Sequence, residues 1–184
     1  IEDASHAIGA SYKKIKVGSC AHSDITVFSF HPVKIITSAE GGMALTNDKE
    51  IADKILRLRT HGITNDKKKM KKQSEDEIWN YQQIDLGFNY RMNDIQAALG
   101  LSQMKRLDKF VERRHKIAKY YNAKLNGLPL ILPWQFPSAY SSYHLYPILI
   151  KSSLAAKTQK QVYNELRKND IAANLHYIPV HRHP

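Results

Sequence analysis

The segment at residues 25–30, I-T-V-F-S-F, constrains the fold of this chain most, because β-branched and aromatic side chains occupy both of its faces. A strand of that kind is typical of a parallel sheet that is covered on both sides. A second strand is predicted at residues 43–46, and apolar side chains then recur at helical spacing over residues 49–60. Because strands alternate with a helix, the sequence predicts an α/β fold.

A long helix is predicted further along the chain. It begins at Asn93, where Gln96 three residues later completes a capping-box pattern, and it ends at the Asn-Gly pair of residues 126–127. A helix of this length usually bridges two lobes, so we expect the boundary between a large and a small domain near residue 110. The predicted domains are residues 1–110 and residues 111–184.

The last third of the chain carries weaker signals. Prolines and a run of serines and tyrosines predict a loop over residues 133–143. The other predicted elements are strands at residues 130–132, 145–150 and 172–176 and a helix at residues 158–169. These elements indicate a small α/β domain.

Lys34 lies in an apolar loop between the two predicted strands, upstream of Gly41 and Gly42, where bulkier residues would collide or be unable to turn. A lysine amine attacks a carbonyl only when it is deprotonated, and partial burial among apolar residues lowers its pKa toward neutrality. Its apolar neighbours in the sequence are Phe28, Phe30, Val33, Ile35 and Ile36. This arrangement suits a Schiff-base lysine. The alternative is an exposed, solvated lysine, which most lysines are.

Asp3 is the second candidate site residue. It follows what reads as a short strand and precedes a stretch of small residues at positions 4–10, which allows close backbone approach. If Lys34 carries pyridoxal phosphate, the ring nitrogen of that cofactor must stay protonated, and a carboxylate beside it achieves this. By itself, an aspartate at this position is more typical of a turn or a helix cap.

Five blocks of the sequence together resemble the DegT/DnrJ/EryC1/StrS family of sugar aminotransferases, which use pyridoxal phosphate to aminate keto sugars carried on nucleotides. The blocks occur in the family's order across nearly the whole chain. They are residues 2–10 (E-D-A-S-H-A-I-G-A), 28–34 (F-S-F-H-P-V-K), 37–42 (T-S-A-E-G-G), 87–100 (G-F-N-Y-R-M-N-D-I-Q-A-A-L-G) and 174–181 (N-L-H-Y-I-P-V-H). The resemblance implies the aspartate-aminotransferase-like fold, or fold type I. Residues 1–110 would form part of the large cofactor-binding domain, and residues 111–184 an incomplete small domain.

The resemblance also implies a role for individual residues. Lys34 would form the Schiff base with the cofactor and move the proton between substrate and cofactor. Asp3 would pair with the pyridinium nitrogen, and His6 would lie against the cofactor ring or its phenolic oxygen. Ser29 would bind the cofactor phosphate, and Asn89 would reach that phosphate from the neighbouring subunit, since hydroxyl and amide groups donate well to oxyanions. Without the resemblance, Ser29 is typical of a packed strand and Asn89 of a turn.

The substrates and partners implied by the resemblance are a nucleotide-linked keto sugar, an amino-acid donor such as glutamate, and a second copy of the chain in a homodimer with a shared active site. The block at residues 141–149 (S-S-Y-H-L-Y-P-I-L) is most similar to enzymes that act on UDP-linked 4-keto-6-deoxy-N-acetylhexosamines, as in the pseudaminic acid pathway. His176, Tyr177 and His181 are substrate-side candidates. Because a dehydratase branch of the family carries histidine instead of the Schiff-base lysine, Lys34 favours amino transfer.

Members of the resembled family are much longer than 184 residues. The chain begins at their mid-sequence strand and stops before their C-terminal segment. We therefore expect this polypeptide alone to be inactive, and either to associate with itself or to be marginally stable, because it would expose strand edges and apolar faces. A non-catalytic relic of the fold is the alternative.

The chain is strongly basic, with 28 Lys and Arg against 17 Asp and Glu and a net charge of +11. Much of the excess lies in K-K-K-M-K-K at residues 67–72, inside a polar run that predicts a solvated loop. Alternatives are a tract that attracts a diphosphate or a partner, or a basic module that binds polyanions. The tract lacks the interleaved aromatic residues of nucleic-acid binders, and the five ordered blocks have no role in a polyanion module, so no nucleic-acid partner is expected.

The remaining composition suggests an enzyme of the cytoplasm. Cys20 is the single cysteine, which fits a reducing compartment, and no apolar run approaches the roughly twenty residues needed to cross a bilayer. No membrane partner is therefore expected. The histidines near the end of the chain lack an H-x-x-x-H helix or a cysteine partner, so we expect no metal site; they are His144, His176, His181 and His183.

Overall fold

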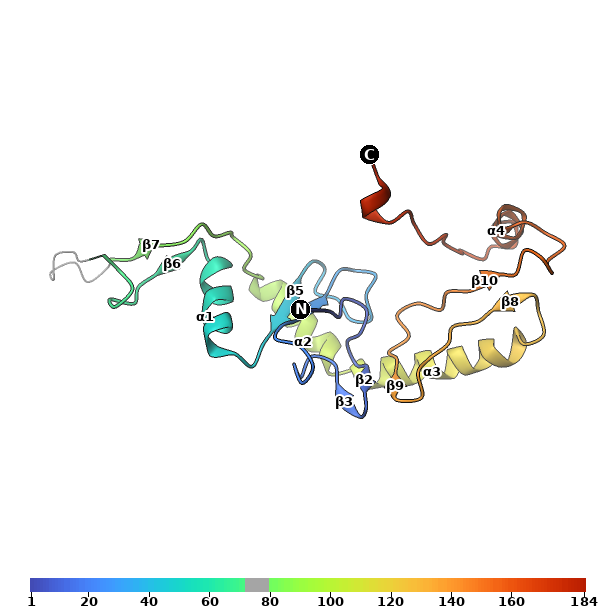
Figure 1. Ribbon diagram of the computed structural model, residues 1–184, viewed down its shortest axis with the longest axis horizontal. Helices are drawn as coiled ribbons and strands as arrows, with labels where there is room; N and C mark the ends of the chain where they lie inside the picture. Colours follow the sequence, from blue (N-terminus) through green and yellow to red (C-terminus); the bar gives the residue numbers. More distant parts are fainter. Residues whose placement is uncertain (72–79) are drawn as a thin grey trace.

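The structure is a computed structural model that describes residues 1–71 and 80–184 (Figure 1). The elements in chain order are β1 (Glu2–Asp3), β2 (Ser11–Tyr12), β3 (Ile15–Lys16), β4 (Thr26–Ser29), β5 (Gly42–Leu45), α1 (Lys49–Leu58), β6 (Ile63–Thr64), β7 (Gln82–Gln83), α2 (Asp94–Met104), α3 (Leu107–Lys124), β8 (Leu130–Ile131), β9 (Ala139–Tyr140), β10 (Leu149–Ile150), α4 (Gln159–Lys168) and the 3₁₀ helix η1 (Val180–Arg182). The molecule is elongated. The sheet of β1, β4 and β5 lies at its centre, α1 with β6 and β7 extends to one side, and β8, β10 and α4 extend to the other (Figure 1).

The central sheet has the strand order β1-β4-β5. β4 is parallel to β1 and antiparallel to β5, so the predicted parallel pairing exists on one side of β4. Thr26 and Phe28 are buried, whereas Val27 and Ser29 on the opposite face are half-buried. The prediction that both faces of this strand are buried is therefore wrong for this chain, because the described residues cover the second face only in part.

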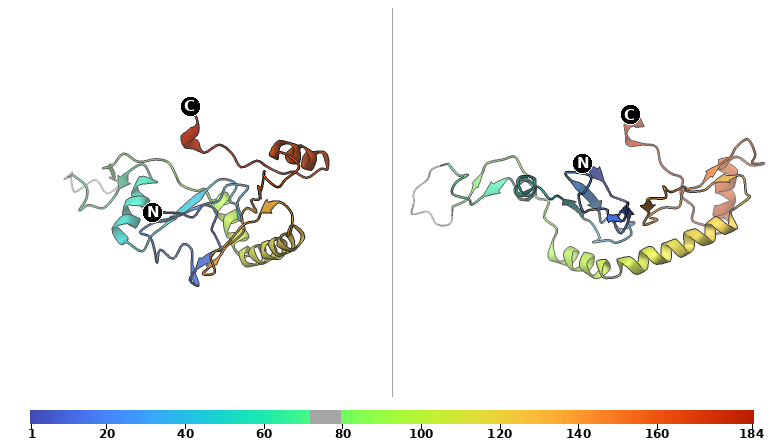
Figure 2. Two further views of the ribbon diagram at one scale, coloured as in Figure 1. Left: turned by 45° about the vertical axis from the view of Figure 1, so that its right-hand side comes forward. Right: turned by 60° about the horizontal axis from the view of Figure 1, so that its bottom comes forward.

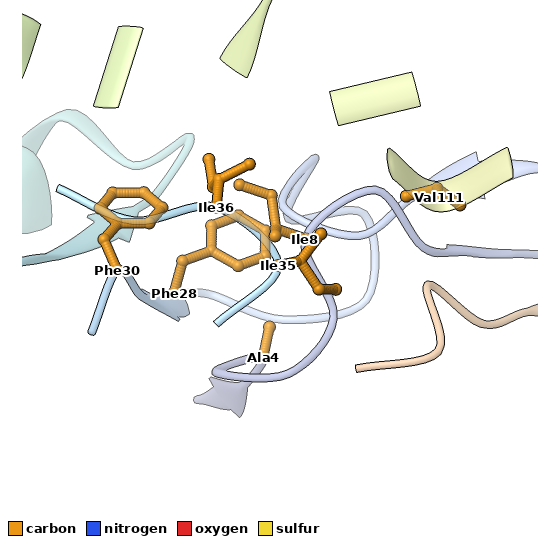
Figure 3. Packing of buried hydrophobic residues seen from close by; sticks show 7 residues of the cluster. All are labelled: Ala4, Ile8, Phe28, Phe30, Ile35, Ile36 and Val111. Atoms are coloured by element: carbon orange, nitrogen blue, oxygen red, sulfur yellow. The ribbon is translucent and has the colours of Figure 1, made fainter. Parts of the chain in front are cut away.

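The hydrophobic core lies between β4, the loop that follows it, the loop that follows β1, and α3 (Figure 3). Its buried members are Ala4, Ile8, Phe28, Phe30, Ile35, Ile36 and Val111. A large apolar side chain buried in this way contributes roughly 1.5–3 kcal/mol. Gly9 has a φ of +84°, and a Cβ there would lie 2.8 Å from Cγ2 of Val111. Glycine is therefore required for the first loop to approach α3 this closely.

The loop that carries Lys34 closes tightly onto the core. The backbone N–H of Ser38 donates to the carbonyl of Phe30 at 3.0 Å, and that of Lys34 donates to the carbonyl of His31 at 2.9 Å. A Cβ at Gly42 would lie 2.9 Å from the carbonyl oxygen of Phe28. The predicted collision of a bulkier residue at the start of β5 is therefore confirmed.

The single long helix predicted after Asn93 is wrong in one respect, because it is divided into α2 and α3 (Figure 2). At the break, Arg106 has φ −109° and ψ 0°, and its N–H bonds to Gln103 three residues back rather than four. The predicted capping box is confirmed, since Asn93 and Gln96 each accept a hydrogen bond from the other's backbone N–H. The division into domains at residue 110 stays a prediction.

The predicted elements of the last third are present in shorter form. β8 and β10 form an antiparallel pair, and α4 begins at a capping box made by Thr158 and Gln161. Pro147 offers no N–H to a sheet, and the strand predicted over residues 145–150 is limited to β10. The strand predicted at residues 172–176 is wrong, because this segment is not in a strand and pairs with none of the strands in the described part of the chain.

A small sheet with the order β3-β2-β9 was not predicted. In it, Ser11 and Tyr12 pair with Tyr140 and Ala139, which lie in the segment predicted as a loop. This pairing places the residues after β9 beside the loop that follows β1. None of the helices within residues 1–71 and 80–184 is both long and apolar enough to span a membrane.

Candidate active site

Three loops of the central region converge around Lys34. The first begins at Asp3, the last residue of β1, and continues to His6; the second follows β4 and carries Lys34; the third follows β9 and carries His144. Because β1 and β4 are parallel, their carboxyl ends lie at the same edge of the sheet. The charge of the Lys34 ammonium acts on Asp3, His6 and His144. The structure thus brings together three of the residues predicted from the sequence, Asp3, His6 and Lys34.

Two hydrogen bonds fix the carboxylate of Asp3. Its Oδ1 accepts one from the Ser5 hydroxyl at 2.6 Å and one from the Ser5 backbone N–H at 3.1 Å. These bonds, and then the charges of His6 and Lys34, lower the pKa of Asp3 below 3.8, so the group is anionic at neutral pH. Oδ2 accepts no hydrogen bond from the described residues. The turn predicted as the alternative role of Asp3 is thus present. Oδ2 remains able to accept a hydrogen bond.

His6 packs against a second histidine. Its ring centroid lies 4.3 Å from that of His144, and the two planes are inclined by 56°. Burial lowers the pKa of His6, and the charges of Lys34 and His176 lower it further, while Asp3 opposes them. The neutral imidazole is therefore the favoured form of His6 at neutral pH.

Lys34 is half-buried at the surface of the core. Four of its five predicted apolar neighbours are buried beneath the loop, namely Phe28, Phe30, Ile35 and Ile36. Val33 is 64 % exposed, so the prediction that it contributes to apolar surroundings that bury Lys34 is wrong. The loop is therefore anchored by the residues after Lys34 rather than by the residue before it.

The two predicted phosphate ligands lie in different places. Ser29 is half-buried at the end of β4, and its Oγ accepts a hydrogen bond from the backbone N–H of His31 at 3.5 Å, in the same loop as Lys34. Asn89 lies in another cluster, where it bridges to Thr60 and its Oδ1 accepts a hydrogen bond from Nε of Arg91 at 3.2 Å. A single chain does not bring Asn89 to Lys34, and its action from a neighbouring subunit stays a prediction.

The predicted substrate-side residues belong to the C-terminal segment, which runs back from α4 toward the centre of the molecule (Figures 1 and 2). The charge of His176 acts on His6, so this residue lies near the cluster. Tyr177 is 72 % exposed and its ring lies 5.0 Å from that of His176. His181 is exposed in η1.

Sequence reasoning missed His144, which it considered only as a metal ligand. Burial, followed by the charges of His6, Lys34 and Arg114, lowers the pKa of His144 to about 4. Its Nδ1 is buried and has no hydrogen-bond partner in the described residues. The signal available in the sequence was its position inside the block at residues 141–149, and the contact with His6 spans too much of the chain to be predicted from local pattern.

Other parts of the surface offer less chemistry. Two shallow hollows, one lined by residues of α1 and β6 and one beside β8, include none of the clustered residues. Within residues 1–71 and 80–184, no three side chains of His, Cys, Asp and Glu gather closely enough to hold a metal ion. The candidate site is therefore an open cluster of one carboxylate, one amine and several imidazoles.

The lysine tract lies on a turn between β6 and β7, and its last residue, Lys72, falls outside the described residues. Lys67, Lys68 and Lys69 are exposed. Asp66 accepts a hydrogen bond from the backbone N–H of Lys68, and the Lys69 ammonium lies 3.9 Å from its carboxylate. The described part of the tract is a solvated loop, as predicted.

Three comparisons identify relatives of this chain. The sequence profile of the DegT/DnrJ/EryC1/StrS aminotransferase family matches residues 1–184. The chain is 39% identical over 182 residues to the UDP-4-amino-4,6-dideoxy-N-acetyl-beta-L-altrosamine transaminase of Campylobacter jejuni, covering 98% of this chain and 45% of that protein. Its structure matches Helicobacter pylori PseC, an aminotransferase involved in the biosynthesis of pseudoaminic acid, with a TM-score of 0.82 and 35% identity over 98% of this chain and 45% of PseC.

A further solved structure, Spr1654 from Streptococcus pneumoniae in its PLP form, is described as a sugar aminotransferase. It matches with a TM-score of 0.80 and 31% identity over 95% of this chain and 43% of that one. The chain thus spans less than half the length of the relatives that it matches. The family profile matches the whole length of the chain, and the solved structures that it resembles are sugar aminotransferases of fold type I. The chain therefore belongs to the DegT/DnrJ/EryC1/StrS family of pyridoxal-phosphate-dependent aminotransferases.

Proposed function

We propose that the protein to which this chain belongs transfers an amino group from an amino acid to a nucleotide-linked keto sugar, with pyridoxal phosphate as its cofactor. The observation that carries the proposal is the convergence of Asp3, His6 and Lys34 at the carboxyl ends of β1 and β4. Family membership supports the reaction class and the cofactor. It does not favour the alternative of a basic module that binds polyanions.

The donor set of the cluster fits pyridoxal phosphate. Lys34 provides an amine for the carbonyl carbon, Asp3 provides an anionic oxygen for a pyridinium N–H, and Ser29 provides a hydroxyl for the phosphate. When bound, pyridoxal phosphate supplies an electron sink for the transfer of the amine. The residues of this chain then have to bind it, orient it and move one proton.

Lys34 holds and releases that proton at Nζ. Ile35 and Ile36 are buried, so the loop that carries this amine is anchored in the core. A general acid or base works only within hydrogen-bond reach of the reacting atom, so a fixed loop favours efficient proton movement.

Asp3 keeps its negative charge through the two hydrogen bonds from Ser5. Since its pKa is lowered, the carboxylate stays ionised and Oδ2 can accept the N–H of the cofactor ring. His6, whose pKa is also lowered, is neutral and can lie against the ring without adding a second cation beside Lys34.

Asn89 would act from the second subunit of a homodimer. Because its Oδ1 already accepts a hydrogen bond from Arg91, its amide Nδ2 is the group left to donate. A donor is what a phosphate oxygen requires, so this orientation supports the phosphate role.

The proposed acceptor is a UDP-linked 4-keto-6-deoxy-N-acetylhexosamine, and the proposed donor is glutamate. The similarity to the UDP-4-amino-4,6-dideoxy-N-acetyl-beta-L-altrosamine transaminase of Campylobacter jejuni supports the sugar class. His176, Tyr177 and His181 are the proposed substrate-side residues, and the effect of the His176 charge on the pKa of His6 supports the choice of His176. We further propose that the reaction takes place in the cytoplasm.

The test is an amino-transfer assay on the full reading frame that encodes this chain. Glutamate and the UDP-linked keto sugar are supplied, and the amino sugar is measured. We expect turnover in the native protein, none in Lys34→Ala, and native turnover in Lys54→Ala, a matched change at an exposed lysine on α1. Turnover in Lys34→Ala comparable to that of the native protein would contradict the proposal.

A further inference from the structure

The segment that follows β9 is held firmly by α3. Nη1 of Arg114 donates to the carbonyl oxygens of Tyr143 at 3.0 Å and of His144 at 3.3 Å. Nε2 of His115 lies 2.7 Å from the carbonyl oxygen of Ser141, and its ring stacks on that of Tyr140 at 4.2 Å. Backbone carbonyls bound in succession by one helix fix the path of the segment and so the position of the His144 side chain.

The same segment is tied directly to the loop that carries His6. Ser142 is only 1% exposed, and its hydroxyl donates to the carbonyl oxygen of His6 at 3.1 Å. A buried hydroxyl finds a partner because leaving it unpaired is costly. This bond therefore joins the backbone of His6 to the residue two positions before His144.

The side chains of His6 and His144 continue this contact. Their rings lie 4.3 Å apart, while Nδ1 of His144 is buried without a hydrogen-bond partner in the described residues. Nothing in its hydrogen bonding explains why this side chain is an imidazole at this position. What the ring does do is cover one side of His6.

We propose that His144 is a positioning residue of the candidate site, a ring fixed by α3 that holds the His6 ring beside Lys34. The inference rests on the proposed function, because there His6 lies against the bound cofactor. No role in that reaction was assigned to His144 from the sequence. It acts through His6 and contacts neither the cofactor nor the substrate.

The charges around His144 are consistent with this role. Besides burial, the groups that face it are His6 on the first loop, Lys34 on the second and Arg114 on α3, and together they lower its pKa to about 4. A lowered pKa means that the neutral form persists at every pH above that value. His144 therefore adds no cation beside Lys34 at neutral pH.

The first test needs no cofactor. Imidazole NMR of the full reading frame gives the pKa of His6, which burial lowers below 6.5. We expect His144→Ala to raise the pKa of His6 toward its usual value, because the covering ring is gone, and His144→Phe to leave it lowered. His22→Ala is the control, since that ring contacts Tyr12 instead. Should His144→Ala fail to fold, His144→Asn serves in its place with the same expected rise.

The second test measures the affinity for pyridoxal phosphate from its absorption. Loss of an aromatic pair in His144→Ala is expected to weaken binding about three- to tenfold, and His144→Phe less than about twofold. An unchanged pKa of His6 in His144→Ala, or an equal rise in His144→Phe, would overturn the positioning role. If the native protein binds no pyridoxal phosphate, the proposed function fails, while the NMR comparison still decides the role of His144.

Discussion

The sheet region, meaning the central sheet with the loops that follow β1 and β4, and helix α2 are both rich in apolar side chains. Only the sheet region buries a cluster of them. Ile36 and Phe30 are 1% and 5% exposed, whereas Ile95 and Leu101 on α2 are 83% and 67% exposed. α2 has no buried residue at all. Apolar residues that face water along a helix are typical of an interface. The sheet region therefore has a core within the described residues, although one face of β4 is covered only in part, whereas α2 lacks the partner that would cover it.

The accessible surface of the molecule supports this contrast. It measures 14462 Å², while a compact monomer of 21.1 kDa exposes roughly 9,000 Å². Large apolar side chains contribute to this surface, among them Leu86, Ile95 and Leu101. Polypeptide outside this chain, or a second copy of it, would bury such faces.

The largest expected effect separates the two regions by stability. Ile36→Ala removes a fully buried side chain and should lower the free energy of unfolding by about 2–5 kcal/mol. Ile95→Ala, the same change on α2, should cost at most about 0.5 kcal/mol in the isolated chain. Chemical denaturation of the 184-residue chain measures both. Equal costs at a dilution at which the chain is monomeric would mean that α2 is buried within the chain itself and that the comparison is wrong.

The next effect concerns the chemistry of the sheet region. Asp3→Asn removes the anionic oxygen while keeping its size, and should reduce turnover about 100-fold or more, as the loss of a preorganised electrostatic contact does. Ser5→Ala is the matched variant. It raises the pKa of Asp3 toward its usual value, yet the carboxylate stays ionised at pH 7, so turnover there should fall little. The measurement is the kcat of each variant relative to the native protein, in the full reading frame.

The same pair predicts a pH dependence. The pKa of Asp3 is lowered in the folded state, so the native protein should keep the negative charge of Asp3 when the pH falls below the pKa of an ordinary aspartate. Activity should be lost only when the pH passes the lowered pKa of Asp3. In Ser5→Ala the acidic limb of the pH profile should move to higher pH. An identical acidic limb in both proteins would show that the ionisation of Asp3 does not set the loss of activity at low pH.

A smaller effect is expected from charge on the α2 face. The isolated chain should associate with itself, and Ile95→Glu should weaken that association about tenfold, since a carboxylate would have to be desolvated in the contact. Gln159→Glu, which adds the same charge at an exposed polar position of α4, provides the control. Sedimentation velocity measures the change, and a native chain that is monomeric with a cooperative melt would show that the face needs no cover.

The smallest effect tests what stabilises α2 in the absence of burial. Asn93→Ala removes one half of the capping box and should cost about 1 kcal/mol. Thr158→Ala at the equivalent position of α4 should cost about as much. Loss of far-UV helical signal on urea titration reports both changes.

Local sequence signals predicted the parts of the fold that depend on neighbouring residues. The cap at Asn93, the helix after Thr158, β4 and the loop of Lys34 all follow from local patterns in the sequence. The break at Arg106 carries no glycine or proline and so left no mark in the sequence.

Contacts between distant segments were not predictable in the same way. The pairing of β9 with β2 and the hydrogen bond from Ser142 to His6 join residues far apart in the chain. His144 belongs to the cluster because of those contacts, not because of its local pattern. Lys34 and Asp3 were candidates from their local sequence context, which the family resemblance then supported, whereas only the resemblance marked His6.

The central claim is that Lys34 and Asp3 hold one pyridoxal phosphate between them. Borohydride reduction of the protein loaded with the cofactor, followed by peptide mass spectrometry, tests it most directly. We expect the Lys34 peptide of the native protein to carry the added mass of one cofactor. At limiting cofactor, a smaller fraction of this peptide should be labelled in Asp3→Asn. Attachment to another lysine, or full labelling of Asp3→Asn at the same limiting concentration, would contradict it.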